Sequence, residues 1–232
     1  MINFALIGCG RVAPRHAQSF RQLHETRLVA TADTRFERAR RFADEYNADA
    51  YENYHDLLAR PDVEAVSICV PSGLHAQVAI DALQAGKHVL VEKPIALSLA
   101  DAYRMIAAAH ANGRRLGVVL QNRLNSPMQQ VRQAVDDGLL GRLYLGNACV
   151  RWFRPQSYYE DGWHGTWAMD GGALMNQSIH HIDALQWLMG PVQSVQAYAA
   201  TLAHQMEAED VGVAVLRFAN GAAALSCRGL GA

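Results

Sequence analysis

A short stretch near the amino terminus constrains the fold more than any other part of the sequence. The apolar residues 4–7 are followed by the spacing Gly-x-Gly-x-x-Ala at Gly8, Gly10 and Ala13, and a helical pattern begins at residue 12. Glycine permits a tight turn and lets backbone amides approach a phosphate, and a small third residue lets the helix pack closely on the strand. The helix N-terminus adds positive potential. The stretch therefore predicts a strand, a phosphate-binding turn and a helix.

The end of the second apolar run distinguishes a dinucleotide site from an ordinary connection between a strand and a helix. Asp33 stands at that end. A carboxylate there hydrogen-bonds the ribose hydroxyls of NAD and repels the 2′-phosphate of NADP. Arg35 lies close by and weakens this repulsion, so the sequence favours NAD over NADP but leaves both open.

The rhythm of apolar residues changes near residue 121. Before it, strand-like runs at 4–7, 28–32, 65–70, 88–91 and 116–120 alternate with helical patterns at 12–24, 35–46, 74–85 and 99–112. Continuous apolar strands between helices predict a parallel sheet covered on both faces. After it come helices at 127–137 and 172–188 and strands at 143–154, 192–203, 211–218 and 222–228. We expect an α/β domain at 1–121 and an α+β domain at 122–232.

Composition excludes several classes of protein. The 232 residues carry a net charge of −1, half are hydrophobic and 19% are charged, which argues against a disordered chain and against a partner such as nucleic acid or an anionic membrane. The first residues lack the basic and small-residue features of a signal peptide, so we expect a cytoplasmic protein. Four separated cysteines, none in a Cys-x-x-Cys spacing, predict buried free thiols.

A charged turn follows the fourth strand-like run. Lys93 stands between Glu92 and Pro94. Ligands of open α/β sheets bind at the carboxyl ends of the strands, which places Lys93 where a nicotinamide and a substrate would meet. A solvated loop lysine is the alternative interpretation. Pro94 restricts the backbone of Lys93 and allows a cis bond.

The helical pattern 172–188 carries a second polar group. Asn176 and His180 are four residues apart and Asp183 follows one turn later, so a continuous helix would align them. An amide, an imidazole and a carboxylate in line would orient a hydroxyl and accept its proton. A packed helix with satisfied polar groups is the alternative. We expect no metal site, because the adjacent His180 and His181 point in different directions on a helix.

These motifs together resemble the Gfo/Idh/MocA oxidoreductase family, through segments 4–13, 69–75, 82–94 and 171–183. The resemblance implies an N-terminal doubly wound Rossmann sheet and a second α+β domain with a mostly antiparallel open sheet. It implies that Lys93 and His180 are the catalytic pair and leaves open which of them first takes the proton. Cofactor contacts are expected from Gly8, Gly10, Arg11, Val12, Asp33, Pro71, Ser72, His75, Glu92, Lys93 and Gln121.

Segments 121–125, 154–159, 162–167 and 175–177 resemble one subgroup, the WlbA/WbpB-type dehydrogenases. These oxidise C3 of UDP-N-acetylglucosaminuronic acid during O-antigen biosynthesis. Asn176 agrees with the subgroup and replaces the aspartate of the wider family. The resemblance implies substrate contacts from Lys93, Arg123, Arg154, Trp167, Asn176 and His180.

The resemblance also implies partners. We expect a nucleotide-sugar substrate, 2-oxoglutarate as a hydride acceptor, and a homo-oligomer, dimer or tetramer, if the second sheet is complete. Relatives usually continue further, so we expect the C-terminal part of the second domain to be missing. Three alternatives stay open: another sugar or cyclitol oxidoreductase or keto-sugar reductase, a non-catalytic dinucleotide-binding regulator, and an inactive truncated remnant. The Lys93 and His180 pair favours an enzyme.

Overall fold

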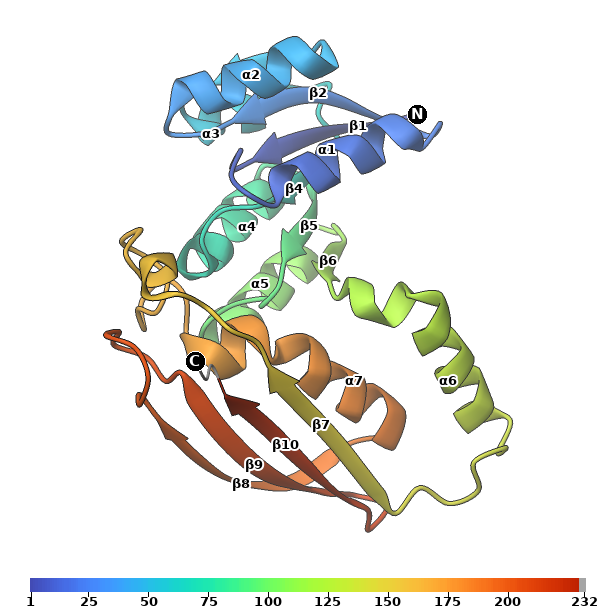
Figure 1. Ribbon diagram of the computed structural model, residues 1–232. Coiled ribbons are helices and arrows are strands. Elements are labelled where there is room, and N and C mark those ends of the chain that lie inside the picture. The colour runs from blue at the N-terminus through green and yellow to red at the C-terminus, as the bar shows by residue number, and fades with distance from the viewer. Residues whose placement is uncertain (230–232) are drawn as a thin grey trace. The chain divides into compact units, whose positions relative to one another are not determined.

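The computed structural model describes residues 1–229, which divide after Val119 into two units (Figure 1). The first unit consists of β1 (Ile2–Ile7), α1 (Ala13–Gln22), β2 (Thr26–Ala32), α2 (Phe36–Tyr46), β3 (Asp49–Tyr51), α3 (Tyr54–Leu58), β4 (Ala65–Ile68), η1 (Ser72–Leu74), α4 (His75–Gln84), β5 (His88–Glu92), α5 (Leu99–Ala111) and β6 (Leu116–Val119). Its six strands are parallel, in the order β3-β2-β1-β4-β5-β6. This is the doubly wound Rossmann order, and the predicted fold class is confirmed.

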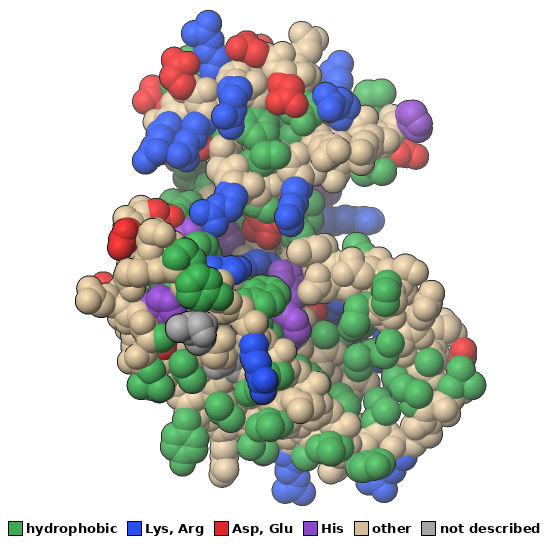
Figure 2. Space-filling view, in the orientation of Figure 1, with side chains coloured by type: hydrophobic (Ala, Val, Ile, Leu, Met, Phe, Trp, Pro, Cys, Tyr) green, Lys and Arg blue, Asp and Glu red, His purple; other side chains and the backbone are tan. Residues whose placement is uncertain are grey.

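Alternating side chains of β1 enter two separate hydrophobic clusters. Leu6 packs in one cluster with Phe20 of α1 and Phe42 of α2. Ile7 packs in the other with Leu83 of α4. Successive residues of a strand point to opposite faces, so the continuous apolar run in the sequence reflects burial on both faces. Helix α2 turns its other side to solvent, and Figure 2 shows charged side chains gathered over it.

Two elements of the first unit escape the apolar pattern. Strand β3 has three residues and helix α3 has five. Elements this short do not show the two-residue repeat of a strand or the 3.6-residue repeat of a helix in their apolar residues. The Asn53 side chain accepts a hydrogen bond from the amide of His55, 3.0 Å away, and so caps α3. Local side-chain capping rather than periodicity therefore marks this helix.

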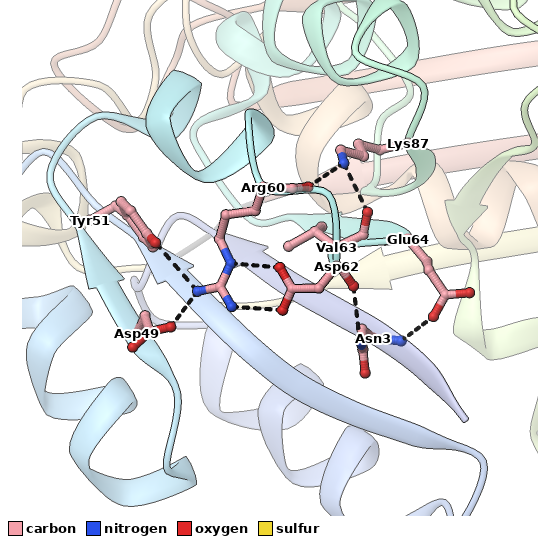
Figure 3. Close-up of polar contacts among 8 residues, drawn as sticks. All are labelled: Asn3, Asp49, Tyr51, Arg60, Asp62, Val63, Glu64 and Lys87. Carbon is pink, nitrogen blue, oxygen red and sulfur yellow. Dashed lines mark hydrogen bonds and ion pairs between the residues drawn. The ribbon is translucent and has the colours of Figure 1, made fainter.

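A polar network closes the amino ends of these strands (Figure 3). Lys87, just before β5, is buried and donates from Nζ to the carbonyl oxygens of Arg60 and Val63, at 2.6 and 2.9 Å. The Arg60 guanidinium binds Asp62 through two nitrogens, at 2.9 and 2.7 Å, and also reaches Asp49 at the start of β3. Burial lowers the pKa of Lys87. The network ties the loops at this end of the sheet to one another.

The second unit holds η2 (Gln121–Leu124), α6 (Ser126–Asp136), β7 (Leu145–Arg151), η3 (Gln156–Tyr159), η4 (Ala173–Gln177), α7 (Ile179–Met189), β8 (Val192–Ala200), β9 (Val211–Phe218) and β10 (Ala223–Gly229). The strand order is β7-β10-β9-β8, and among the described strands of this second sheet only the β7–β10 pair is parallel. The predicted mostly antiparallel sheet is therefore confirmed. Leu185 and Met189 of α7 pack on one of its faces against Leu216 and Phe218.

The prediction of buried cysteines is wrong for half of them. Cys9 and Cys69 are buried, but Cys149 is exposed and Cys227 is partly exposed. Strands β7 and β10 are covered by α7 on one face only, and strand alternation places both thiols on the opposite face. An apolar run in the sequence does not distinguish a strand buried on one face from a strand buried on both. None of the helices described is long and apolar enough to cross a membrane.

Candidate functional site

The turn after β1 contains two glycines with different surroundings. Gly8 has a φ of +91°, and a Cβ added there would lie 2.7 Å from the backbone of Cys69. At Gly10 an added Cβ would meet nothing within 4 Å. Val12, at the start of α1, makes no side-chain cap. Gly8 thus serves the fold, whereas Gly10 leaves open space beside the first amides of a helix, which fits a dinucleotide phosphate.

Asp33 is held at the end of β2 by two backbone amides. Its Oδ2 accepts from the amide of Cys9 and its Oδ1 from the amide of Arg35, each at 2.8 Å. A carboxylate has about four acceptor positions, so both oxygens retain capacity for ribose hydroxyls. The bond to Cys9 also fixes the carboxylate relative to the glycine turn. This arrangement fits the adenosine ribose of NAD.

The loop after β4 braces the turn that follows β5. The buried ring of His75 lies with Nδ1 2.7 Å from the carbonyl oxygen of Pro94 and Nε2 3.0 Å from that of Val70. Burial lowers the pKa of His75, although the hydrogen bonds to the two carbonyls oppose this. Both ring nitrogens of His75 therefore contact backbone carbonyl oxygens of the protein. The expected contact between His75 and the cofactor stays a prediction. Pro71 and Ser72 precede it in the same loop.

Lys93 follows β5 directly, and its bond to Pro94 is cis. The backbone amide of Lys93 donates to Oε2 of Glu92 at 3.2 Å, and Oε1 of Glu92 lies 2.9 Å from Nε2 of His16. His16 Nδ1 lies 2.8 Å from the hydroxyl of Ser67. A ring protonated on Nε2 donates to the carboxylate and accepts from the hydroxyl. A continuous chain of polar contacts therefore supports the backbone of Lys93.

Glu92 remains ionised within this chain. Burial raises its pKa, but the hydrogen bond from His16, together with the backbone amide and the charge of Lys93, outweighs burial and holds the pKa of Glu92 below its usual value. Sequence reasoning missed His16 and Ser67. His16 could have been found in the sequence as a polar residue on the apolar face of the predicted first helix, because it lies among the buried Ala13, Ala17 and Phe20 of α1.

The predicted helix 172–188 is interrupted. A turn of π-helix, η4, covers Ala173–Gln177, and the regular helix α7 begins only at Ile179. Glu209 shapes this entry by accepting from the amide of Leu174 at 2.9 Å, and a Cβ at Gly172 would collide with its carboxylate. The alignment of Asn176 and His180 on one continuous α-helix is therefore wrong. Both side chains are nevertheless buried within the second unit.

The carboxylate beside Asn176 is Asp170, a residue that sequence reasoning gave no role. Asn176 donates from Nδ2 to Oδ1 of Asp170, and Oδ2 of Asp170 accepts from the amide of Gly165 at 2.8 Å. Asp170 is 2% exposed. The predicted carboxylate, Asp183, instead binds Arg123, whose Nε lies 2.7 Å from Oδ2. Asp183 is thus not part of the predicted amide–imidazole–carboxylate line.

The remaining predicted residues are distributed over both units. Arg154 donates from Nη2 to Gln177 at 3.1 Å, and its guanidinium lies over the ring of Tyr158. Trp167 is exposed, and Gln121 is exposed at the start of η2. In the first unit Arg11 is exposed and Val12 is half-buried. Within residues 1–229 no group of three or more His, Cys, Asp or Glu side chains is placed to hold a metal ion.

Taken together, the parallel sheet, the glycine turn and the fixed Asp33 define a dinucleotide-binding protein with a second α+β unit. Residues 2–120 match the family described as "Oxidoreductase family, NAD-binding Rossmann fold", and residues 128–226 match the GFO/IDH/MocA C-terminal domain. The chain belongs to this Gfo/Idh/MocA oxidoreductase family. NAD is accordingly the cofactor class of its first domain, as the residues predict.

Solved structures extend the comparison. The chain is 43% identical to the WlbA dehydrogenase of Bordetella pertussis, covering 99% of this chain and 71% of that one, with a TM-score of 0.95. It is 39% identical to the WlbA dehydrogenase of Chromobacterium violaceum, covering 99% and 67%, with a TM-score of 0.96. Both structures are complexes with NADH and UDP-GlcNAcA.

A curated relative has a different substrate in its name. The chain is 28% identical to myo-inositol 2-dehydrogenase of Thermotoga maritima over 95% of its own length, and spans 66% of that protein. These matches run along nearly the whole of the present chain. The chain spans about two thirds of the length of each of these three proteins, at 71%, 67% and 66%.

Proposed function

We propose that this chain oxidises the C3 hydroxyl of UDP-N-acetylglucosaminuronic acid to the 3-keto sugar with NAD⁺ as oxidant. The observation that carries the proposal is the identity of 39% and 43% to two WlbA dehydrogenases bound to NADH and UDP-GlcNAcA. Identity to the myo-inositol 2-dehydrogenase is lower, at 28%.

The first unit supplies the cofactor site and one member of the catalytic pair. NAD⁺ accepts the hydride that leaves C3. Gly8, Gly10 and the start of α1 bind the diphosphate, and Asp33 binds the adenosine ribose. Lys93 acts at the C3 hydroxyl, and the hydrogen bond from its backbone amide to Glu92 helps to hold it in place. The positive nicotinamide ring favours the neutral form of a nearby lysine, which suits the removal of a proton.

The second unit supplies His180 and the residues that orient the sugar. Either His180 or Lys93 takes the proton first. Asn176, oriented by the buried Asp170, fixes the sugar near C3. Arg154, whose planar fork suits a carboxylate or a diphosphate, binds the uronate or the diphosphate. Arg123, Trp167 and Gln121 complete the proposed contacts at the sugar and the cofactor.

The wider setting is part of the same proposal. The product would enter O-antigen biosynthesis, with 2-oxoglutarate recycling the bound NADH. The protein would work as a homo-oligomer in the cytoplasm.

A second candidate is oxidation of a cyclitol. It is favoured by the likeness to the myo-inositol 2-dehydrogenase of T. maritima along 95% of this chain. Both candidates use the same cofactor site and the same catalytic pair, so the residues of the first unit do not separate them. Arg154 does, because a neutral cyclitol has no anionic group for its guanidinium.

The test is a substrate comparison. Purified protein is mixed with NAD⁺ and either UDP-GlcNAcA or myo-inositol, with and without 2-oxoglutarate, and the reduced cofactor and the keto product are quantified. We expect a 3-keto nucleotide sugar with UDP-GlcNAcA only. Oxidation of myo-inositol alone would refute the assignment in favour of the second candidate. Binding of NADH without turnover of any sugar would favour the non-catalytic regulator.

A further inference from the structure

The connection between β8 and β9, residues 201–210, closes on a buried carboxylate. Asp210 is fully buried and accepts from the amides of Leu202, Ala203 and His204, each at 2.8 Å. The same carboxylate lies 3.0 Å from Nδ1 of the His204 ring. Burial raises its pKa, but the hydrogen bonds from the amides and from His204 hold the pKa of Asp210 below its usual value. An ionised carboxylate therefore fixes both the backbone of the connection and the ring of His204.

The second ring nitrogen of His204 reaches the segment that follows β7. Nε2 lies 2.8 Å from the carbonyl oxygen of Arg154, which requires a proton on this nitrogen because a carbonyl oxygen only accepts. Beside it, the amide of Gln205 donates to Oε1 of Gln156 at 3.0 Å, and Nε2 of Gln156 donates to the carbonyl oxygen of Gln205 at 3.1 Å. The side chain of His204 is 7% exposed. The connection therefore holds the backbone on both sides of Pro155.

The guanidinium of Arg154 is itself ordered by its neighbours. Nη1 donates to the carbonyl oxygen of Phe153 at 3.0 Å, and Nη2 donates to Oε1 of Gln177 at 3.1 Å. The guanidinium lies 5.6 Å from the ring centroid of Trp152 and 5.4 Å from that of Tyr158, within the range of a cation–π contact. Among the described residues these bonds occupy two of its five N–H groups, so donors remain for an anion.

The same connection supports two further segments proposed to bind the sugar. Oε2 of Glu207 accepts from the amide of Trp167 at 3.2 Å. The carbonyl oxygen of Glu209 accepts from the amide of Ala173 at 2.8 Å, where the π turn η4 begins. Residues 201–210 therefore contact three segments of the second unit that the proposed function uses. His204 is the contact that reaches the backbone of Arg154.

We propose that His204 is a positioning residue for the substrate: held by Asp210, it fixes the backbone of Arg154 and so places the guanidinium for the anionic part of the nucleotide sugar. The inference rests on the proposed function, because it takes Arg154 as a substrate contact. A side chain that is ordered before binding loses less conformational entropy when it binds an anion. His204 acts through Arg154 and takes no part in the chemical step, so its loss should weaken substrate binding and spare hydride transfer.

Two substitutions each keep one of the two contacts of His204. The side-chain nitrogen of glutamine comes close to the place of Nε2, and that of the shorter asparagine comes close to the place of Nδ1. His204→Gln therefore keeps a donor for Arg154, and His204→Asn keeps one for Asp210. We expect His204→Asn to raise KM for UDP-GlcNAcA about tenfold with kcat changed less than about twofold. His204→Gln should stay close to the unmutated protein in both constants.

A double variant tests whether the effect passes through Arg154. Arg154→Met should raise KM about a hundredfold, and adding His204→Asn to it should raise KM no further, because residues that act through one contact are not additive. Thr201→Val is the matched control within the connection. It removes the hydrogen bond from Oγ1 of Thr201 to the carbonyl oxygen of Ala208, at 2.8 Å, and it should leave KM unchanged. Melting temperature and NADH binding check that each variant is folded.

Two further measurements need no turnover. Calorimetric titration of the NADH-bound protein with UDP and with UDP-GlcNAcA locates the anion: His204→Asn should weaken both if Arg154 binds the diphosphate, and only UDP-GlcNAcA if it binds the uronate. The guanidinium signals of Arg154 in ¹⁵N-arginine-labelled protein, assigned with Arg154→Met, should be resolved in His204→Gln and averaged in His204→Asn. If the unmutated protein oxidises no UDP-GlcNAcA, the proposed function fails, whereas these signals still decide whether His204 orders Arg154.

Any of four results would overturn the proposal. The first is an unchanged KM in His204→Asn, or a rise in Thr201→Val of the same size. The second is a double variant that loses the full product of the two single effects, which would mean that His204 acts elsewhere. The third is a fall in kcat at unchanged KM. The fourth is loss of the folded protein in both His204 variants, which would assign His204 to the stability of the fold.

Discussion

The chain has two lysines, and they stand at opposite ends of the same strand, β5 (His88–Glu92). Lys87 precedes the strand, is 7% exposed, and donates to the carbonyl oxygens of Arg60 and Val63. Lys93 follows the strand, where its own amide donates to Glu92. A lysine therefore binds the backbone of neighbouring loops at the amino end of the sheet, and another lysine belongs to the candidate site at the carboxyl end.

The difference extends to the rest of the sheet. At the amino end, Arg60, Asp62 and Asp49 satisfy one another. At the carboxyl end, Gly10 leaves open space and Asp33 retains acceptor capacity beyond its two amide bonds. Polar groups that are satisfied within the protein stabilise it, whereas groups with unused capacity are available to a ligand. Substitutions at the two ends should accordingly separate stability from function.

The largest effect is expected at Lys93. Lys93→Met removes an acid–base group, and we expect hydride transfer to fall by about 10²–10⁴-fold, while NADH still binds. Stopped-flow formation of NADH after mixing with UDP-GlcNAcA measures the rate. A variant with the normal rate would remove Lys93 from the catalytic pair.

The next effect is expected at the glycine turn. Gly10→Val places a branched side chain in the open space beside α1, and the loss of charge-assisted bonds to the diphosphate should weaken NADH binding by about a hundredfold or more. Titration of NADH by calorimetry measures this. Gly8→Ala is the matched control, since its added Cβ would meet the Cys69 backbone at 2.7 Å, and it should destabilise the fold. Equal effects of the two variants on stability would contradict the division between the glycines.

A smaller effect, on stability alone, is expected at Lys87. Lys87→Met leaves the carbonyl oxygens of Arg60 and Val63 without their donor, and each unsatisfied buried group costs about 1–3 kcal/mol. Urea unfolding measures the loss. Hydride transfer by the folded variant should equal that of the unmutated protein, and unchanged stability would show that water replaces the lysine without cost.

The smallest effect is expected in how Glu92 changes the unfolding free energy at acidic pH. The pKa of Glu92 is lower in the folded protein than its usual value of 4.5, so the folded state binds fewer protons there than the unfolded state. Its contribution to stability is present above about pH 4.5 and is lost as the pH falls through the lowered value. Glu92→Gln has no such group and should show a shallower decline in unfolding free energy below pH 4.5. Parallel curves for the two proteins would mean that His16 does not stabilise the carboxylate.

The sequence predicts those parts of the site that depend on local order. Gly8, Gly10 and Asp33 lie at fixed distances along a strand–turn–helix–strand unit, so their positions follow from the pattern. The pairs that cross the fold do not. His16 and Glu92 are 76 residues apart, and Arg123 and Asp183 are 60 apart. The π turn at Ala173–Gln177 depends on Glu209, which comes much later in the chain, and a helical pattern alone cannot reveal it.

The most direct test of the contrast between the two ends of β5 is hydride transfer to NAD⁺ in Lys87→Met and Lys93→Met, measured side by side at a temperature where both are folded. We expect Lys87→Met to form NADH at the rate of the unmutated protein, although it is less stable than that protein, and Lys93→Met to form almost none. Loss of hydride transfer in a folded Lys87→Met protein that still binds NADH would contradict the account.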